Sequence, residues 1–220
     1  MKKELERIAR MRKIARTLKQ LYTNPKTELT YEKNFQFLVA VMLSAQCTDK
    51  KVNECTDSLF KKYKTSKDFA HARLSVLQKE IGTIPFFRNK AKHIVHSAQL
   101  IEEKFYGEVP KTIDELMQLP GVAYKTANVV LGELFDIWEG IATDTHVRRF
   151  ALRFDLTDNT DLTKISKDLE ALVPKKDWKY VNNGFVLYGR YVCPARPHDC
   201  EKHPLTKIWP PSMSRWPKAK

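Results

Sequence analysis

The stretch from residue 112 to residue 146, TIDELMQLPGVAYKTANVVLGELFDIWEGIATDTH, most constrains the fold of this chain. Thr112 and Glu115 have the spacing of a capping box, which predicts a helix that opens at Thr112 and ends before the following proline. Gly121 gives the backbone the freedom that a tight connection needs, and helical periodicity resumes at Tyr124. The stretch therefore predicts two helices joined by a hairpin.

The start of the second helix is a candidate binding site for an anion. Its first N–H groups have no partner within the helix, and the positive end of the helix dipole adds to their attraction for a phosphate. We therefore expect the backbone at Gly121, Ala123 and Tyr124 to hold a phosphate of a nucleic acid.

Two residues near the hairpin have the chemistry of a reactive site. Lys125 lies in the first helical turn, where the helix dipole disfavours an ammonium and favours the neutral, nucleophilic amine. Asp144 precedes a segment that looks like another helix start, so its carboxylate is expected to cap that helix and stay ionised. Taken singly, a lysine in a helix is usually a solvated charge and an aspartate before a helix is usually a simple cap.

The segments LPGVAYKTANVVL and ATDTH together closely resemble the helix-hairpin-helix, Gly/Pro-rich loop and aspartate signature of the endonuclease III family of DNA glycosylases. The resemblance implies that Lys125 attacks C1′ of a damaged nucleotide and that Asp144 assists. Ala123 departs from the family pattern, which usually has a second glycine at this position of the hairpin.

Helical periodicity recurs along the chain and no strand alternation is present, so we expect an all-α fold. The segment 34–43 is apolar almost all round, which predicts a buried central helix. The N-terminal helix is expected to bury a stripe made of Leu5, Ile8, Met11 or Arg12, Ala15, Leu18 and Leu21. The resemblance implies one domain from residue 27 to residue 137 and a second from residues 1–26 joined to 138–220, with a DNA-binding cleft between them.

The net charge of +13, from 39 basic and 26 acidic residues, favours a polyanionic partner. A merely basic, soluble surface is the alternative. No long apolar segment or amphipathic anchor stands out, so we expect no membrane partner. The N-terminus is charged rather than apolar, which predicts a cytoplasmic protein, associated with the nucleoid if prokaryotic. We expect a monomer whose partner is duplex DNA with damaged bases or abasic sites.

The resemblance also assigns residues that contact DNA. It implies that Gln46 fills the gap left by an extruded base and that Phe86 is a wedge in the base stack. Arg88, Lys90 and Lys92 are expected to contact phosphates. The alternatives are that Gln46 caps a helix and that Phe86 packs in a core.

The segment that begins at residue 189 resembles the entry to the family's iron-sulfur loop, in which four cysteines are separated by six, two and five residues. Cys193 and Cys200 fit the first gap, but His203 and Trp209 stand at the third and fourth positions. Because a cubane cluster normally needs four cysteines, we expect the cluster to be lost and Trp209 to fill the space. No cofactor is therefore expected.

Zinc is the alternative at this loop. Cys193, Cys200 and His203 could bind it with His198 as a fourth ligand, but their sequence spacing matches no zinc module. The other cysteines, Cys47 and Cys55, are expected to be small buried hydrophobes. Further expectations are DNA-side charges at Arg190 and Arg196 and a loosely ordered tail from Trp209.

These features predict a bifunctional DNA glycosylase and abasic-site lyase of base excision repair. The resemblance implies that it removes oxidised pyrimidines and cuts the strand by β-elimination through a lysine Schiff base. Two alternatives remain. One is a glycosylase without lyase activity that acts on mismatched thymine or uracil, and the other is a helix-hairpin-helix protein that only binds DNA.

Overall fold

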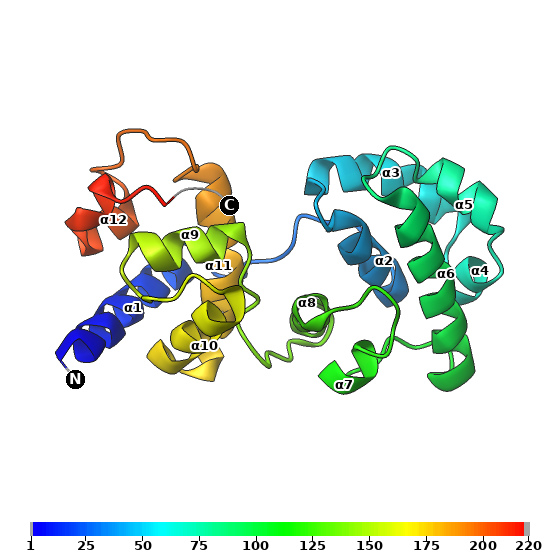
Figure 1. The fold of residues 1–220 in the computed structure, drawn as a ribbon, viewed down its shortest axis with the longest axis horizontal. Helices are drawn as coiled ribbons and strands as arrows, with labels where there is room; N and C mark the ends of the chain where they lie inside the picture. The colour runs from blue at the N-terminus through cyan, green and yellow to red at the C-terminus, as the bar shows by residue number, and fades with distance from the viewer. Residues whose placement is uncertain (1, 218–220) are drawn as a thin grey trace. The chain divides into compact units, whose positions relative to one another are not determined.

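The computed structural model describes residues 2–217, and every regular element among them is a helix. The all-α fold predicted from the sequence is confirmed. The helices fall into two compact units, one made of residues 27–137 and the other of residues 1–26 and 138–220. Figure 1 shows the helices of each unit.

The unit 27–137 is built around a buried helix. Its helices are α2 (Asn34–Ser44), α3 (Asp49–Lys62), α4 (Ser66–Ala70), α5 (Leu74–Glu80), α6 (Phe87–Lys104), α7 (Ile113–Leu116) and α8 (Tyr124–Phe135). Helix α2 is buried at every position from Phe35 to Leu43, as its apolar composition predicts. Helices α3, α6 and α8 pack against it, and α6 also packs against α4 and α5.

The other unit combines the first helix with the last third of the chain. Its elements are α1 (Lys2–Leu21), α9 (Thr145–Arg153), α10 (Leu162–Leu172), the 3-10 turn η1 (Lys175–Asp177), α11 (Trp178–Tyr191), α12 (Pro204–Ile208) and the 3-10 turn η2 (Pro210–Ser214). Helix α1 packs against α10, α11 and α12, and α9 packs against α10 and α11. Gly189 permits the close approach of α9 to α11, because a Cβ there would lie 2.6 Å from the Arg149 guanidinium.

The predicted apolar stripe of α1 is correct only in its middle. Met11, Ala15 and Leu18 are buried, but Leu5 and Leu21 are 63% and 44% exposed. Ile8 is partly buried and packs against the core of this unit. Ile14, which the stripe omitted, is fully buried.

The segment from Trp209 is folded as far as the structure describes it, so the expectation of a loose tail is wrong there. Ser212 is fully buried, and its carbonyl accepts a 2.9 Å hydrogen bond from Nε of Arg153. Residues 218–220 lie outside the described part. No helix among residues 2–217 has the length and apolar character that crossing a membrane requires.

Candidate functional site

The hairpin begins with the predicted helix cap. Oγ1 of Thr112 accepts a hydrogen bond from the Glu115 N–H at 3.3 Å, and its hydroxyl donates to the Glu115 carboxylate at 2.8 Å. Helix α7 is shorter than the sequence suggests, because it ends at Leu116. After it the N–H groups of Gln118 and Leu119 bond to carbonyls three residues earlier, which forms a turn before the proline.

The loop of the hairpin is fixed against α6. Gly121 has a φ of +82°, and a Cβ at this position would lie 2.7 Å from Nδ1 of His93 on α6. The Ser97 hydroxyl, one helical turn further along α6, donates to the Pro120 carbonyl at 3.0 Å. Both the backbone conformation and the neighbouring helix therefore require glycine here.

The N-terminus of α8 is open to solvent. Ala123 is its N-cap residue, and alanine has no side-chain atom that can accept a hydrogen bond from the first turn. Gly121, Ala123 and Tyr124 are all exposed. Lys125 is exposed as well, and no carboxylate among residues 2–217 pairs with it. The helix start thus offers accessible N–H groups beside an accessible amine.

Lys90 on α6 is buried, so the expectation that it contacts a phosphate is wrong. Its ammonium donates to the carbonyls of Leu43 at 2.8 Å and Ala45 at 2.6 Å. Burial lowers the pKa of Lys90. The signal was present in the sequence, since Lys90 lies at helical spacing with the buried residues Ile94, Ser97, Ala98 and Ile101.

Gln46 and Phe86 lie in two turns that Lys90 connects. The Lys90 ammonium bonds to the carbonyl just before Gln46, and the Lys90 backbone N–H bonds to the Phe86 carbonyl at 3.1 Å. Both residues have left-handed backbones, with φ of 56° for Gln46 and 59° for Phe86. Such conformations cost about 1–3 kcal/mol in residues other than glycine, and they are common at functional sites. Phe86 is 62% exposed, which excludes a core position.

Asp144 caps α9, as the sequence predicts. Its Oδ1 accepts a 2.8 Å hydrogen bond from the Val147 N–H, and the residue is half-buried. Burial lowers the pKa of Arg149 on the same helix, and the Asp144 carboxylate acts in the opposite direction. Asp144 belongs to the unit 1–26 and 138–220, whereas Lys125 belongs to the unit 27–137.

Two arginines connect α9 to the cysteine-containing loop. Arg149 donates to the Cys193 carbonyl at 2.6 Å. Arg153 is fully buried and donates to Sγ of Cys193 at 2.8 Å and to Sγ of Cys200 at 2.9 Å. The Trp216 ring covers its guanidinium at 3.8 Å. Burial raises the pKa of the Cys193 thiol.

The iron-sulfur cluster that is usual in the resembled family does not fit this loop. Two cysteines are present, and the Trp209 ring at the fourth position lies 4.5 Å from the Arg10 guanidinium and 4.8 Å from that of Arg215. The remaining cysteines, Cys47 and Cys55, belong to the unit 27–137. Four thiolates therefore do not converge as a cubane needs. The tryptophan stacked on Arg153 is Trp216, rather than the Trp209 that was expected to fill this space.

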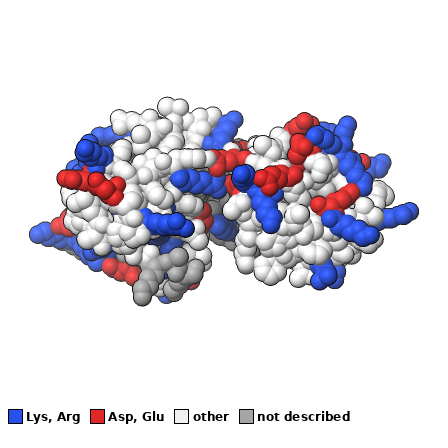
Figure 2. All heavy atoms as spheres, turned by 90° about the horizontal axis from the view of Figure 1, so that it is seen from above, with Lys and Arg blue, Asp and Glu red and all other residues white. Residues whose placement is uncertain are grey.

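Basic side chains do not outline one continuous patch on the face seen in Figure 2, where acidic side chains lie among them. Arg88 is exposed beside the Phe87 ring, at 5.2 Å, and Lys92 and Arg196 are also exposed. Arg190 is half-buried. On that face, charge alone does not mark a binding site.

Comparison with known proteins gives a consistent result. Residues 39–175 match the family described as HhH-GPD superfamily base excision DNA repair protein. The endonuclease III of Synechocystis sp. is 42% identical over 90% of this chain and 90% of that protein. The endonuclease III of Bacillus subtilis is 41% identical over 86% of each. A solved structure of a trapped endonuclease III–DNA covalent intermediate has a TM-score of 0.86 and 35% identity, with 94% of this chain and 97% of that one covered.

Proposed function

The chain belongs to the endonuclease III family of the HhH-GPD superfamily of base excision repair proteins, and from this premise we propose how its own residues perform the reaction. The protein is a DNA glycosylase and abasic-site lyase that acts on damaged duplex DNA. We propose that its substrates are oxidised pyrimidines in DNA.

Two structural features of the unit 27–137 are assigned to DNA binding. The hairpin backbone at Gly121, Ala123 and Tyr124 holds a phosphate, because these residues are exposed and no side chain caps the start of α8. The exposed Phe86 is the wedge that stabilises a kinked duplex, and Gln46 fills the gap left by the extruded base. Their shared link to Lys90 supports a joint role. Arg88, Arg190 and Arg196 are assigned to phosphates.

The chemistry is assigned to Lys125 and Asp144. The lone pair of Lys125 Nζ forms a bond to C1′ while the bond from C1′ to the base breaks and the base leaves. Opening of the sugar ring yields an imine between the lysine and C1′. Removal of a proton from C2′ then breaks the bond to the 3′ phosphate by β-elimination. The Asp144 carboxylate stabilises the electron-poor sugar or accepts the proton from Lys125.

The reaction in this scheme uses side chains alone. The steps are nucleophilic attack, imine formation and proton transfer, none of which changes the oxidation state of a metal. We therefore propose that catalysis needs no four-cysteine iron-sulfur cluster, in keeping with the histidine and tryptophan that stand at the third and fourth cysteine positions, His203 and Trp209.

The proposal is carried by Lys125, which is exposed and has no ion-pair partner among residues 2–217. It lies in the first turn of α8, whose N-cap residue has no capping side chain. The test is borohydride reduction with a thymine-glycol duplex and with an abasic duplex. Borohydride reduces the imine, so the wild type should yield a covalent protein–DNA adduct, and Lys125→Ala should yield none. Lys61→Ala, which changes an exposed lysine on α3, is the matched control and should retain the adduct.

The two alternative functions, a glycosylase without lyase activity and a protein that only binds DNA, predict different results in the same experiment. A glycosylase that uses water would release the base without forming an adduct. A protein that only binds DNA would do neither. An adduct that survives in Lys125→Ala would move the nucleophile to another amine.

A further inference from the structure

Three residues of the loop after α11 bring metal-binding atoms together. The Cys193 sulfur and one ring nitrogen each of His198 and His203 all lie within 4.8 Å of one another. These are the soft sulfur and imidazole donors that zinc prefers. Their sequence spacing matches no zinc module, and the fold shows that the ligand atoms of three of the four candidate residues converge.

Both histidines have a buried nitrogen without a partner among the described residues. His198 Nδ1 lies 2.8 Å from the Arg196 carbonyl, which only accepts hydrogen bonds, so Nδ1 carries the proton. The lone pair is therefore on Nε2, and this atom is buried and unpaired. A histidine that ligates a metal commonly donates its other N–H to a backbone carbonyl in this way. His203 Nδ1 is likewise buried and unpaired.

The buried Arg153 lies against two sulfur atoms of this loop. A guanidinium keeps its proton in proteins, and burial of such a charge is costly without an anionic partner. Its acceptors are the Ser212 carbonyl and the sulfurs of Cys193 and Cys200. Thiolates are much better acceptors than thiols, and thiolates bound to a metal ion are present at neutral pH.

We propose that Cys193, His198 and His203 bind a single Zn²⁺ ion, with water in the fourth position. One thiolate and two imidazoles leave one place of a tetrahedral zinc site for that water. Arg153 donates to the sulfur of the ligand Cys193 and orients it, and it also donates to Cys200. The ion takes no part in the reaction. It anchors the loop to the C-terminal end of α9, the helix that Asp144 caps at its N-terminus.

The test is metal analysis of the full chain, purified without a histidine tag, followed by exchange of the metal for Co²⁺ alone. We expect about one zinc per chain, as a single four-ligand site requires. The Co²⁺ form should show the visible bands of tetrahedral coordination and a sulfur-to-cobalt charge-transfer band. Removal of zinc by a chelator should lower the midpoint of thermal unfolding, since the ion binds the folded loop.

Variants identify the ligands. His198→Ala and His203→Ala should each weaken Co²⁺ binding by at least about 10-fold, whereas Cys47→Ser, which removes a thiol of the other unit, should leave it unchanged. If a histidine variant fails to fold, the spectrum of the wild-type Co²⁺ form decides. Protein without zinc whose Co²⁺ spectrum is that of the aqueous ion would overturn the proposal, and so would iron and sulfide in the proportions of a cubane cluster.

Discussion

A methyl group on Gly121 would lie 2.7 Å from Nδ1 of His93. The backbone of Gly121 is also left-handed, with a φ of +82°. Two separate costs therefore oppose any side chain at this position. One is steric and depends on His93, and the other is conformational and does not.

We expect Gly121→Ala to lower the free energy of unfolding by about 1–3 kcal/mol. The double variant Gly121→Ala/His93→Ala should recover only part of this loss, because it removes the clash and leaves the strained φ. Urea unfolding of the wild type, both single variants and the double variant measures the two parts. Full recovery in the double variant would show that backbone conformation contributes nothing to the stability loss.

The affinity for an abasic duplex should also fall in Gly121→Ala, since the loop presents the phosphate-binding N–H groups.

A second prediction concerns Lys90. Lys90→Met keeps the aliphatic length but removes both hydrogen bonds to the carbonyls of Leu43 and Ala45. Hydrogen bonds to charged groups contribute about 1.5–3 kcal/mol, so stability should fall by about that amount. Because the turn that carries Gln46 loses its anchor, excision of a paired lesion should slow more than cleavage at a ready-made abasic site.

Its control is Lys92→Met, which changes an exposed lysine on the same helix. This variant should keep the stability of the wild type and the ratio of excision to strand cleavage. Equal slowing of both activities in Lys90→Met would argue that Lys90 supports the fold in general rather than the Gln46 turn.

Much of the fold follows from local sequence signals. The caps at Thr112 and Asp144 and the buried run 35–43 depend on residues close in sequence, and the structure has each of them. Such features are predictable because a cap bonds within its own first turn, and a helix that is apolar all round indicates burial by its composition alone.

The features that the sequence did not reveal depend on contacts between distant segments. Lys90 bonds to carbonyls more than 40 residues away, with separations of 47 and 45 residues. Arg153 reaches sulfurs 40 and 47 residues further along the chain. Helical spacing can place such a residue on a buried face, as it does for Lys90, but it does not identify acceptor atoms in a distant segment. For the same reason, the sequence offered Cys193, His198 and His203 only as possible zinc ligands, and the fold was needed to show that their ligand atoms meet.

A third prediction separates the two roles of Asp144. Asparagine caps helices about as well as aspartate, so Asp144→Asn should leave the unfolding free energy nearly unchanged. It removes the charge, however, and should slow base excision by about 10²–10⁴-fold, the range for a positioned acid or base. Asp144→Ala should lose both the cap and the activity, with a stability cost of about 1 kcal/mol. Normal turnover by Asp144→Asn would exclude the carboxylate from the chemistry.

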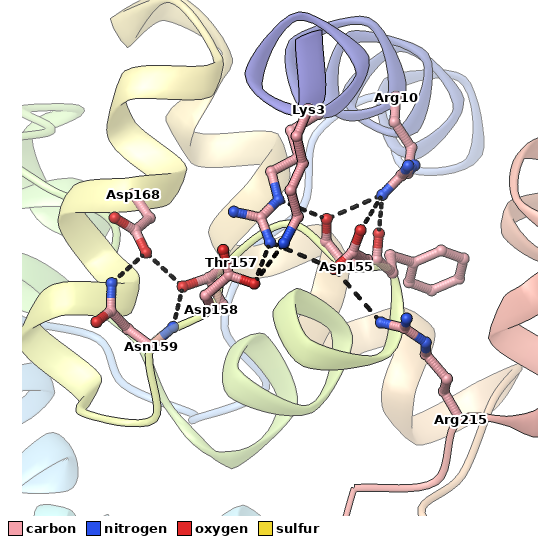
Figure 3. A network of polar contacts seen from close by, with 10 residues as sticks. Lys3, Arg10, Asp155, Thr157, Asp158, Asn159, Asp168 and Arg215 are labelled. Carbon is pink, nitrogen blue, oxygen red and sulfur yellow. Dashed lines mark hydrogen bonds and ion pairs between the residues drawn. The ribbon is translucent and has the colours of Figure 1, made fainter. Parts of the chain in front are cut away.

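A network of charges joins α1 to the turn after α9 (Figure 3). Arg7 pairs with Asp155 and with Asp158, at 3.3 and 2.7 Å, and Lys3 pairs with Asp158 at 2.7 Å. Arg10 and Arg215 also pair with Asp155. The basic face of α1 is thus partly occupied by carboxylates of its own unit. Hydrogen bonds from Arg7 and Lys3 lower the pKa of Asp158 to about 2.

The fourth prediction is the pH dependence of this network. A carboxyl whose pKa is lower in the folded state stabilises the fold above its unfolded pKa, near 3.9 for aspartate, and loses that effect as pH falls through its folded pKa. For Asp158 the window runs from about pH 4 down to about 2. Asp158→Asn should therefore be less stable than the wild type at pH 7, and the two should converge towards pH 2. Because the Asp158 side chain is 66% exposed, solvent and salt screen its ion pairs, and the stability difference should also shrink in high salt.

Urea midpoints from pH 7 to pH 2 measure this stability difference. The control is Asp57→Asn, which breaks an exposed ion pair within α3. A difference between wild type and Asp158→Asn that stayed constant over the whole range would rule out the charge network as its cause.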